Sequence, residues 1–394
     1  MKSYDPVIAN IIADNQETAR DRRHFASATP LDPPLSGGQG REDRINRRQF
    51  LNRLAVGVGG IGGALSALPA FAQLSSGQLQ TDVPEAVPLI PVVEAIGKEI
   101  WKDNQLDEDA VSELFDQAMM KLTGRASAKE AWRDIVLPDD IVGIKINPLG
   151  GPELSTHSII VDKIIEGLYS AGVLHKQVII WDRFEEHLLN AGYPIRQDEG
   201  DVRTLASDTE GIGYDDEVFY ESEKDSVTRR ENGSTFSRYS RIITQMVDVL
   251  INVPVLKHHE MAGVSGCLKN LAFGSVDNTR RFHGKPLYCN PAIAEILEHK
   301  VVQEKLVLNI VDGLVASFDK GPTYHAESTW KYGSLFVSTD PVILDVLVLQ
   351  TINQKREEME LDSVSKFANH ISTASALGLG TNTLDEADLQ KVEI

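Results

Sequence analysis

Five short apolar runs in the middle of the chain constrain its fold more than any other feature. These runs, which are of the buried-strand type, lie at 140–147, 177–182, 247–257, 306–312 and 334–340. Segments with the apolar spacing of helices lie between or after them, at 155–171, 291–300 and 341–358. Strand–helix–strand order with continuously apolar strands is typical of a parallel sheet that is buried on both faces. The sequence therefore predicts an α/β fold, with a mainly parallel sheet flanked by helices.

The rest of the chain divides around this region. We expect a disordered N-terminal region over 1–45, a signal segment over 46–72, and a linker with N-terminal helices over 73–139. The α/β domain is expected over 140–358, interrupted at 184–240 by an acidic insertion that is irregular or antiparallel. A helical tail is expected over 359–394.

The composition excludes several classes of function. Apolar residues make up 42% of the 394 residues and charged residues 25%, as in a soluble globular protein. The net charge of −19 repels phosphate backbones, so nucleic acid is not an expected partner. Only two cysteines are present, Cys267 and Cys289, whereas iron–sulfur clusters usually need four. These two thiols either form a disulfide or remain separate and buried.

The N-terminal segment resembles a twin-arginine export signal. Arg47 and Arg48 precede a mildly apolar, glycine-rich stretch, and Ala70 and Ala72 form a small-residue cleavage pattern at its end. The alternative is an uncleaved membrane anchor, against which the glycines and the terminal proline argue. We therefore expect the twin-arginine translocase as a partner, a periplasmic or otherwise exported location, and no stable membrane span after cleavage.

Polar residues stand at or near the carboxyl ends of the five predicted strands. They are Asn147, Asp182, Lys257, Asp312 and Asp340. In open parallel sheets the ligand crevice lies outside the carboxyl ends of the strands, so these side chains are expected to converge on a site. The alternative is that each one simply begins a loop, where Asn and Asp are common.

The segment 252–274 contains the densest set of reactive side chains. Lys257 and Lys269 are cations in an acidic protein, so they are expected to bind a carboxylate or phosphate, and burial can make a lysine a base. His258 is a second acid/base candidate. The alternative is a pair of solvated lysines in a loop. A metal site from His258 or His259 with His283 is not supported by ligand spacing.

Other candidates lie on the first and last predicted strands. Lys145 and Asn147 share one face of a strand, and a buried Lys145 needs an acidic partner, for which Asp312 and Asp340 are the natural candidates. Asp340 precedes Pro341 and can instead cap the next helix. Asp345, one turn further on, faces either the crevice or solvent.

Several of these motifs together resemble the family called domain of unknown function 362 (DUF 362), over roughly 140–350. They are Ile144-Lys-Ile-Asn-Pro148, Asp248-Val-Leu-Ile-Asn-Val-Pro-Val-Leu-Lys257-His258, Leu268-Lys-Asn-Leu-Ala-Phe-Gly274, Ile310-Val-Asp-Gly313 and Ser338-Thr-Asp-Pro-Val-Ile-Leu-Asp345. The resemblance points to Lys145, Asn147, Lys257, His258, Lys269, Asn270, Asp312, Asp340 and Asp345. Some members carry ferredoxin-type cysteine clusters, which this chain lacks. The family is also remotely similar to the lactate racemase fold, which holds a nickel-pincer cofactor between two α/β domains.

These observations together predict an exported α/β protein that binds an anionic small molecule at the strand ends. Lys145, Lys257 and His258 are the acid/base candidates, and Asn147, Lys269, Asn270, Asp312, Asp340 and Asp345 are expected to bind or orient the ligand. Proton-transfer chemistry of the isomerase, racemase or lyase type is the concrete hypothesis. The alternatives are a non-catalytic periplasmic binding or cofactor-carrying protein, or a redox protein with a non-covalent cofactor. The sequence names no cofactor.

Overall fold

A computed structural model describes residues 89–223 and 234–394 of the chain. The arginine pair at 47–48, the alanines at 70 and 72, the expected disordered region and most of the linker lie outside these ranges. Across the described ranges, every helix falls short of the length and apolar character that a membrane crossing requires.

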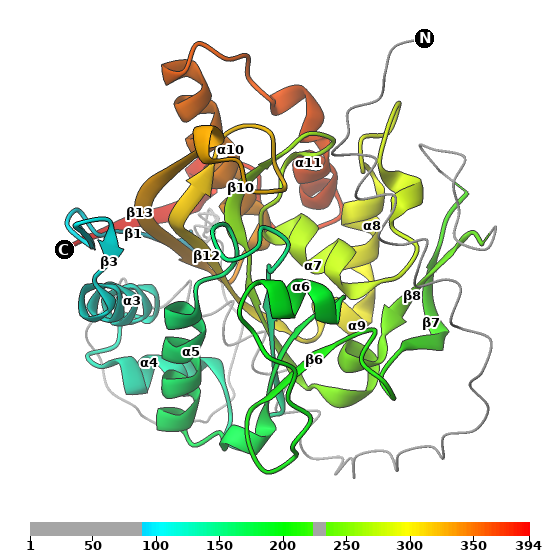
Figure 1. The fold of residues 1–394 in the computed structure, drawn as a ribbon, viewed down its shortest axis with the longest axis horizontal. Coiled ribbons are helices and arrows are strands. Elements are labelled where there is room, and N and C mark those ends of the chain that lie inside the picture. The colour runs from blue at the N-terminus through cyan, green and yellow to red at the C-terminus, as the bar shows by residue number, and fades with distance from the viewer. Residues whose placement is uncertain (1–88, 224–233) are drawn as a thin grey trace, which may run out of the picture. The chain divides into compact units, whose positions relative to one another are not determined.

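A ten-stranded sheet forms the centre of the fold (Figure 1). Eight strands follow the order β14-β1-β13-β12-β9-β4-β5-β6, and β10 and β11 extend the sheet from β12. Pairing is parallel throughout β12, β9, β4, β5 and β6, whereas β13 runs antiparallel to both β12 and β1. The expected mainly parallel α/β sheet is confirmed. Its strands are β1 (Ile90–Ile96), β4 (Val142–Ile146), β5 (Val178–Asp182), β6 (Arg203–Ala206), β9 (Val249–Val253), β10 (Val255–His259), β11 (Gly263–Val264), β12 (Leu306–Ser317), β13 (Thr329–Ser338) and β14 (Ala387–Glu393).

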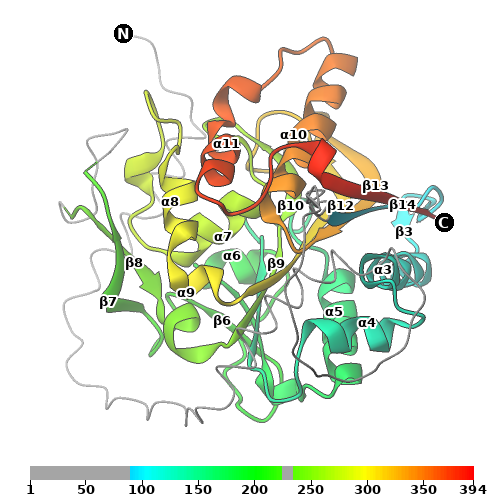
Figure 2. The ribbon, with the colours of Figure 1, turned by 180° about the vertical axis from the view of Figure 1, so that it is seen from behind.

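Helices cover both faces of the sheet (Figures 1 and 2). One face packs against α3 (Glu108–Thr123), α4 (Ala128–Ile135) and α5 (Ser158–Ala171), and we call it the α5 face. The other packs against α7 (Cys267–Ser275), α8 (Ala292–Glu298), α10 (Pro341–Glu358) and α11 (Asn369–Ala376), and we call it the α7 face. Each face has its own apolar cluster, since alternate strand residues point to opposite sides.

The flanking segments differ in part from the expectations. The 73–139 region contains the expected helices α3 and α4, but its residues 90–96 form β1, where β-branched Val92 and Val93 are buried on opposite faces between β13 and β14. The C-terminal tail is only partly helical, because its last segment forms β14 beside β1. The 184–240 insertion contributes β6 to the central sheet, while its β7 (Tyr214–Glu221) and β8 (Phe236–Ser240) form the expected antiparallel pair.

The remaining short elements complete the described chain. They are β2 (Trp101–Lys102), β3 (Gln105–Leu106), α6 (Glu185–Asn190) and α9 (Lys300–Gln303). The long apolar run predicted at 247–257 is divided at Pro254 into β9 and β10, as expected for a residue that cannot donate to a sheet ladder. The division turns β10 away from β9, so that it pairs only with β11 and β12.

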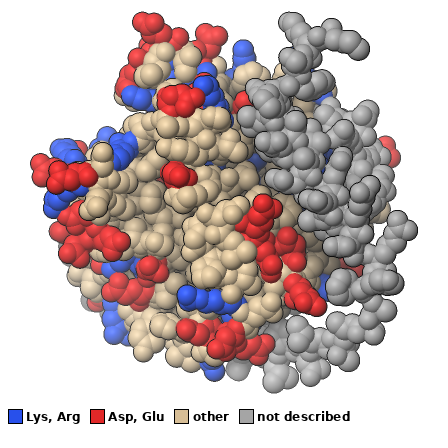
Figure 3. All heavy atoms as spheres, viewed as in Figure 1, with Lys and Arg blue, Asp and Glu red and all other residues tan. Residues whose placement is uncertain are grey.

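The charge of the protein lies mainly at its surface. On the face shown in Figure 3, the middle is largely uncharged, and most acidic and basic side chains lie toward the margin. Some charged side chains are nevertheless buried, among them Lys145, Lys257 and Lys269.

Candidate functional site

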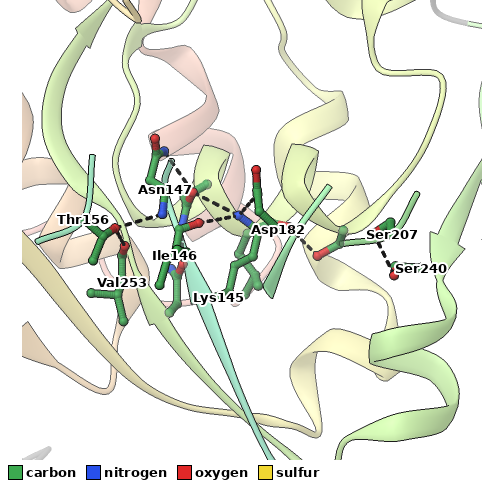
Figure 4. Close-up of polar contacts among 12 residues, drawn as sticks. Lys145, Ile146, Asn147, Thr156, Asp182, Ser207, Ser240 and Val253 are labelled. Carbon is green, nitrogen blue, oxygen red and sulfur yellow. Dashed lines mark hydrogen bonds and ion pairs between the residues drawn. The ribbon is translucent and has the colours of Figure 1, made fainter. Parts of the chain in front are cut away.

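Lys145 lies on β4 beneath helix α7. Its neighbours Ile144 and Ile146 pack on the α5 face, so strand alternation turns Lys145 toward the α7 face. Its side chain is 1% exposed, and Nζ lies 2.5 Å from Asp182 Oδ1 at the end of the adjacent β5 (Figure 4). Nζ also donates to the Ile146 carbonyl at 2.7 Å and to Asn270 Oδ1 at 3.3 Å.

Asp182 is therefore the acidic partner of Lys145. The expectation that Asp312 or Asp340 would pair with this lysine is wrong, because sheet order places β5 directly beside β4. Burial lowers the pKa of Lys145 below its ordinary value, and the charge of Asp182 opposes that shift. The pair stabilises the protonated lysine inside the protein.

Lys257 on β10 has no such carboxylate partner among the residues that the structure describes. Its side chain is 0% exposed, and Nζ reaches only the Leu154 carbonyl, at 3.5 Å. Burial lowers the pKa of Lys257 to about 7; the positive charges of Lys269 and Lys145 add to the shift, and Asp182 opposes it. At neutral pH this amine is therefore poised between its charged and neutral forms.

Lys269 projects from the first turn of α7 and is 8% exposed. Its Nζ lies 5.1 Å from the ring centroid of Phe273. Among the residues that the structure describes, Lys269 and Lys257 form no ion pair with a carboxylate. Burial lowers the pKa of Lys269 to about 8, partly opposed by Cys289, with Arg183 and Lys145 adding to the shift.

Four asparagines form a hydrogen-bonded row under α7. Asn147 Nδ2 donates to Asn270 Oδ1 at 2.9 Å, Asn270 Nδ2 to Asn252 Oδ1 at 2.8 Å, and Asn252 Nδ2 to Asn309 Oδ1 at 2.9 Å. We call these residues the asparagine row. Asn147 and Asn270 were expected in the site. Asn252 and Asn309 were not, although each is a polar residue between apolar neighbours of a buried strand, and this was the signal that could have identified them.

The two neighbouring histidines of β10 lie on opposite sides of the strand. His258 accepts a hydrogen bond on Nδ1 from the backbone of Gly321 at 3.1 Å; burial and then the charge of Arg356 lower its pKa to about 4. His259 shares the side of Lys257, since residues two apart on a strand point the same way. Burial, and then Lys269, lower the pKa of His259 well below its usual value.

His259 is therefore closer to the lysines than the expected His258. Its Nδ1 accepts from the backbone N–H groups of Met261 and Ala262, at 3.1 and 3.2 Å, so Nε2 carries the proton of the neutral ring. Its ring lies 5.7 Å from that of His283. Counting alternate residues from Lys257 could have identified His259 from the sequence.

Asp312 lies on the other side of the sheet from Lys145. Its Oδ2 accepts from the His157 backbone N–H at 2.7 Å and lies 2.8 Å from His157 Nδ1. Burial opposes protonation of His157, but Asp312 outweighs it and raises the pKa of the imidazole. His157 is the residue that precedes α5, so this helix begins at Ser158, inside the predicted segment 155–171. Asp312 thus holds the start of α5 and does not join the lysines.

Asp340 and Asp345 both hold helix ends. Asp340 precedes α10, and its carboxylate accepts from Val342, Ile343 and Thr381 backbone N–H groups at 2.7, 3.1 and 2.8 Å. Because β13 runs antiparallel, Asp340 lies away from the carboxyl ends of β4 and β5. Burial raises the pKa of Asp340 to about 6.

Asp345 supports α7 from its place on α10. It accepts from the first two backbone N–H groups of α7, those of Cys267 and Leu268, at 2.5 and 3.2 Å. Asp345 therefore positions the helix that carries Lys269 and Asn270.

The site as a whole consists of Lys145, Lys257, Lys269, Asp182, His259 and the asparagine row. Within the described ranges, no group of three His, Cys, Asp or Glu side chains is placed to hold a metal ion. Both cysteines are buried with free thiols. The arrangement can hold negative charge on lysines and offers one amine that titrates near neutral pH.

Comparisons with known proteins identify a family. A comparison with the curated proteins finds no match. A crystal structure of a protein from Thermotoga maritima is similar at 12% identity with a TM-score of 0.37; the match covers 65% of this chain and 60% of that one. A family model described as domain of unknown function (DUF362) matches residues 142–350, more than half of the chain. The chain therefore belongs to the DUF362 family.

Proposed function

We propose that this protein is exported, binds a small carboxylate or phosphate anion at the lysine cluster, and transfers a proton through Lys257. The observation that carries the proposal is the charge imbalance at this site. Lys145, Lys257 and Lys269 are all buried, and among the described residues Asp182 is the one carboxylate that forms an ion pair with any of them.

Buried charge must be paired or neutralised. Removing an isolated ammonium group from water is costly, so a buried lysine without a partner shifts toward its neutral form. The lowered pKa values of Lys257 and Lys269 express this cost. An anion placed beside them would restore the balance and would be bound strongly, since the surroundings have a low dielectric constant.

The same imbalance makes Lys257 a base. The fraction of Lys257 that is neutral while the anion is bound can accept a proton from a carbon next to the anionic group of the substrate, and the electron pair then remains on the substrate. Lys269 and Lys145 are the cations that stabilise this negative charge. Return of the proton to either face of the substrate carbanion gives isomerase or racemase chemistry, and loss of a leaving group gives lyase chemistry. A pKa near 7 suits Lys257 to act as the base in these reactions.

Export completes the proposal. The pair Arg47 and Arg48, followed by the apolar stretch and the alanines at 70 and 72, supports the twin-arginine translocase as a partner and a periplasmic or similar location. Fractionation of cells that produce the full chain tests this part. The mature form is expected outside the cytoplasm, and replacement of both arginines with lysine should retain the protein inside.

Anion binding can be tested with substitutions of the site lysines. Succinate and inorganic phosphate are titrated into the wild type, Lys257→Met and Lys269→Met by thermal-shift and calorimetric measurement. Lys176→Met, which removes an exposed lysine, is the matched control. We expect binding in the wild type and the control and at least about tenfold weaker binding in the two site variants. Equal binding in all four proteins would contradict the proposal.

Turnover distinguishes an enzyme from a binding protein. Ligands that bind are incubated with the protein in heavy water, and exchange of their carbon-bound hydrogens is followed by NMR. We expect exchange that requires Lys257. Tight binding without exchange of any ligand would favour the non-catalytic binding protein.

A further inference from the structure

The asparagine row has a fixed polarity, which Lys145 sets. A lysine ammonium group can only donate hydrogen bonds, so the atom of Asn270 that faces Lys145 Nζ must be its oxygen, Oδ1. Asn147 approaches the same oxygen at 2.9 Å and must therefore present its amide nitrogen. The side-chain oxygen of Asn147 is consequently directed elsewhere.

The rest of the row agrees with this polarity. With its oxygen used, Asn270 donates through Nδ2 to Asn252, which in turn donates to Asn309. Asn309 donates to the Thr339 carbonyl at 3.4 Å. Every side-chain amide nitrogen in the row therefore has an acceptor. The one side-chain oxygen of the row that accepts no hydrogen bond is Asn147 Oδ1, at the end opposite Asn309.

Asn147 Oδ1 is a buried acceptor without a donor. The residue is 7% exposed, and no described residue donates to this oxygen. A buried carbonyl that makes no hydrogen bond costs about 1–3 kcal/mol of stability. Such a group therefore needs an explanation, and a bound ligand that donates to it is one. The backbone groups of Asn147 close a loop: its N–H donates to Thr156 Oγ1 at 2.9 Å, and its C=O accepts from the Thr156 N–H at 3.0 Å.

This loop links Asn147 to Lys257. The segment between Asn147 and Thr156 contains Leu154, whose carbonyl accepts a hydrogen bond from Lys257 Nζ. On its other side, Asn147 is joined through Asn270 to Lys145, whose charge contributes to the lowered pKa of Lys257. Asn147, which carries the free acceptor, is thus joined to Lys145 through Asn270 and to Lys257 through the 147–156 segment.

We propose that Asn147 Oδ1 selects anions that carry a hydroxyl group. This inference rests on the proposed function and specifies its substrate class. The anionic group is held by the lysines, and the hydroxyl donates to Asn147. A hydroxyl is favoured over an ammonium group because three lysines repel a second cation.

Three matched four-carbon diacids test the inference by calorimetric titration at pH 7. Malate carries a hydroxyl group where aspartate carries an ammonium group and succinate has neither. We expect malate to bind about tenfold more tightly than succinate, the effect of one hydrogen bond to a buried acceptor, and aspartate to bind more weakly than malate. Glycerol 3-phosphate against propyl phosphate is the equivalent phosphate pair.

Two further measurements assign the preference to Asn147. In Asn147→Ala, malate and succinate should bind within about twofold of each other, while succinate binds as in the wild type. Asn190→Ala, which removes an exposed asparagine at the end of α6 outside the site, is the matched control and should keep the preference. With the wild type alone, 2-methoxysuccinate, which retains the oxygen but cannot donate, should bind no better than succinate, and this measurement does not depend on a variant folding.

The outcomes separate this inference from the proposed function. If the diacids and phosphates bind without preference for the hydroxyl, or if 2-methoxysuccinate binds like malate, the selection by Asn147 is wrong while the anion site stands. If neither diacids nor phosphates bind the wild type, the anion site is wrong and the inference falls with it.

Discussion

Gly274 of α7 lies against the side chain of Lys145 on β4. A Cβ atom added at Gly274 would lie 2.1 Å from Lys145 Cε and 2.6 Å from Nζ, far closer than side chains can pack. Helix α7 can therefore cross the strand only because position 274 has no side chain. The lysine that pairs with Asp182 and fixes the asparagine row depends on this contact.

Substitution Gly274→Ala should displace Lys145. We expect the free energy of unfolding to fall by about 1–3 kcal/mol, the usual cost of overpacking a tight interior. In a Lys145→Ala background the same substitution should cost much less, because the obstructing atoms are gone. Urea denaturation of the four proteins measures this coupling. Additive effects, within about 0.5 kcal/mol, would show that the two residues are independent.

Lys257→Met should stabilise the protein while it removes anion binding. Replacement of a buried, unpaired charge with an apolar side chain of similar volume is expected to raise the free energy of unfolding at pH 7 by about 1–4 kcal/mol. Urea denaturation measures the gain. A loss of stability at pH 7 would mean that Lys257 has a partner that offsets its burial.

The stabilisation by Lys257→Met should depend on pH. The pKa of Lys257 is about 7 in the folded protein and near 10.5 when unfolded, so between these values the unfolded chain binds more protons. The destabilisation caused by Lys257 is therefore complete below pH 7 and disappears as pH rises to 10.5. We expect the difference between variant and wild type to shrink steadily from pH 7 to pH 10. If the difference in free energy of unfolding grew from pH 7 to pH 10, the pKa of Lys257 would be raised rather than lowered by folding.

Anion binding should take up protons above neutral pH. At pH 8 the free protein holds Lys257 mostly neutral and Lys269 about half protonated, and a bound anion raises the pKa of both. Calorimetric titration with phosphate-free ligands in Tris and in HEPES should reveal uptake of about one proton at pH 8. At pH 6, where both lysines are already charged, the uptake should vanish. Identical binding enthalpies in both buffers at pH 8 would exclude the coupling.

Asp345→Asn tests the assignment of Asp345 to helix support. Loss of the charge beside the first N–H groups of α7 should lower the free energy of unfolding by about 1–2 kcal/mol. Affinity for succinate or phosphate, measured below the unfolding temperature, should change by less than about twofold. Loss of binding with unchanged stability would place Asp345 in the ligand site.

The sequence was most informative where a local pattern decides the structure. Helix α10 begins at Pro341 behind the cap Asp340 and ends at Glu358, the range that its apolar spacing indicates. The strands β4 and β5 follow from their apolar runs in the same way. By contrast, the spacing of Val92, Val93 and Ile96 is typical of a helix, and only pairing with β13 and β14 makes this segment a strand.

The site was harder to predict because it depends on how strands are ordered and directed. A buried strand looks the same in sequence whether it runs parallel or antiparallel, so Asp340, which follows β13, could not be excluded from the crevice. The Lys145–Asp182 pair depends on β5 lying beside β4, which no local pattern encodes. Lys145, Lys257 and Lys269 were found because a lysine in an apolar run is unusual.

Direct titration of Lys257 tests the central claim that an uncompensated lysine lies inside this protein. Lysine labelled with carbon-13 at Cε is incorporated into the whole chain, and Lys257→Met identifies the signal. We expect a midpoint near pH 7 in the free protein, moving upward when a bound anion saturates the site. A midpoint near 10.5 that no anion changes would contradict the account.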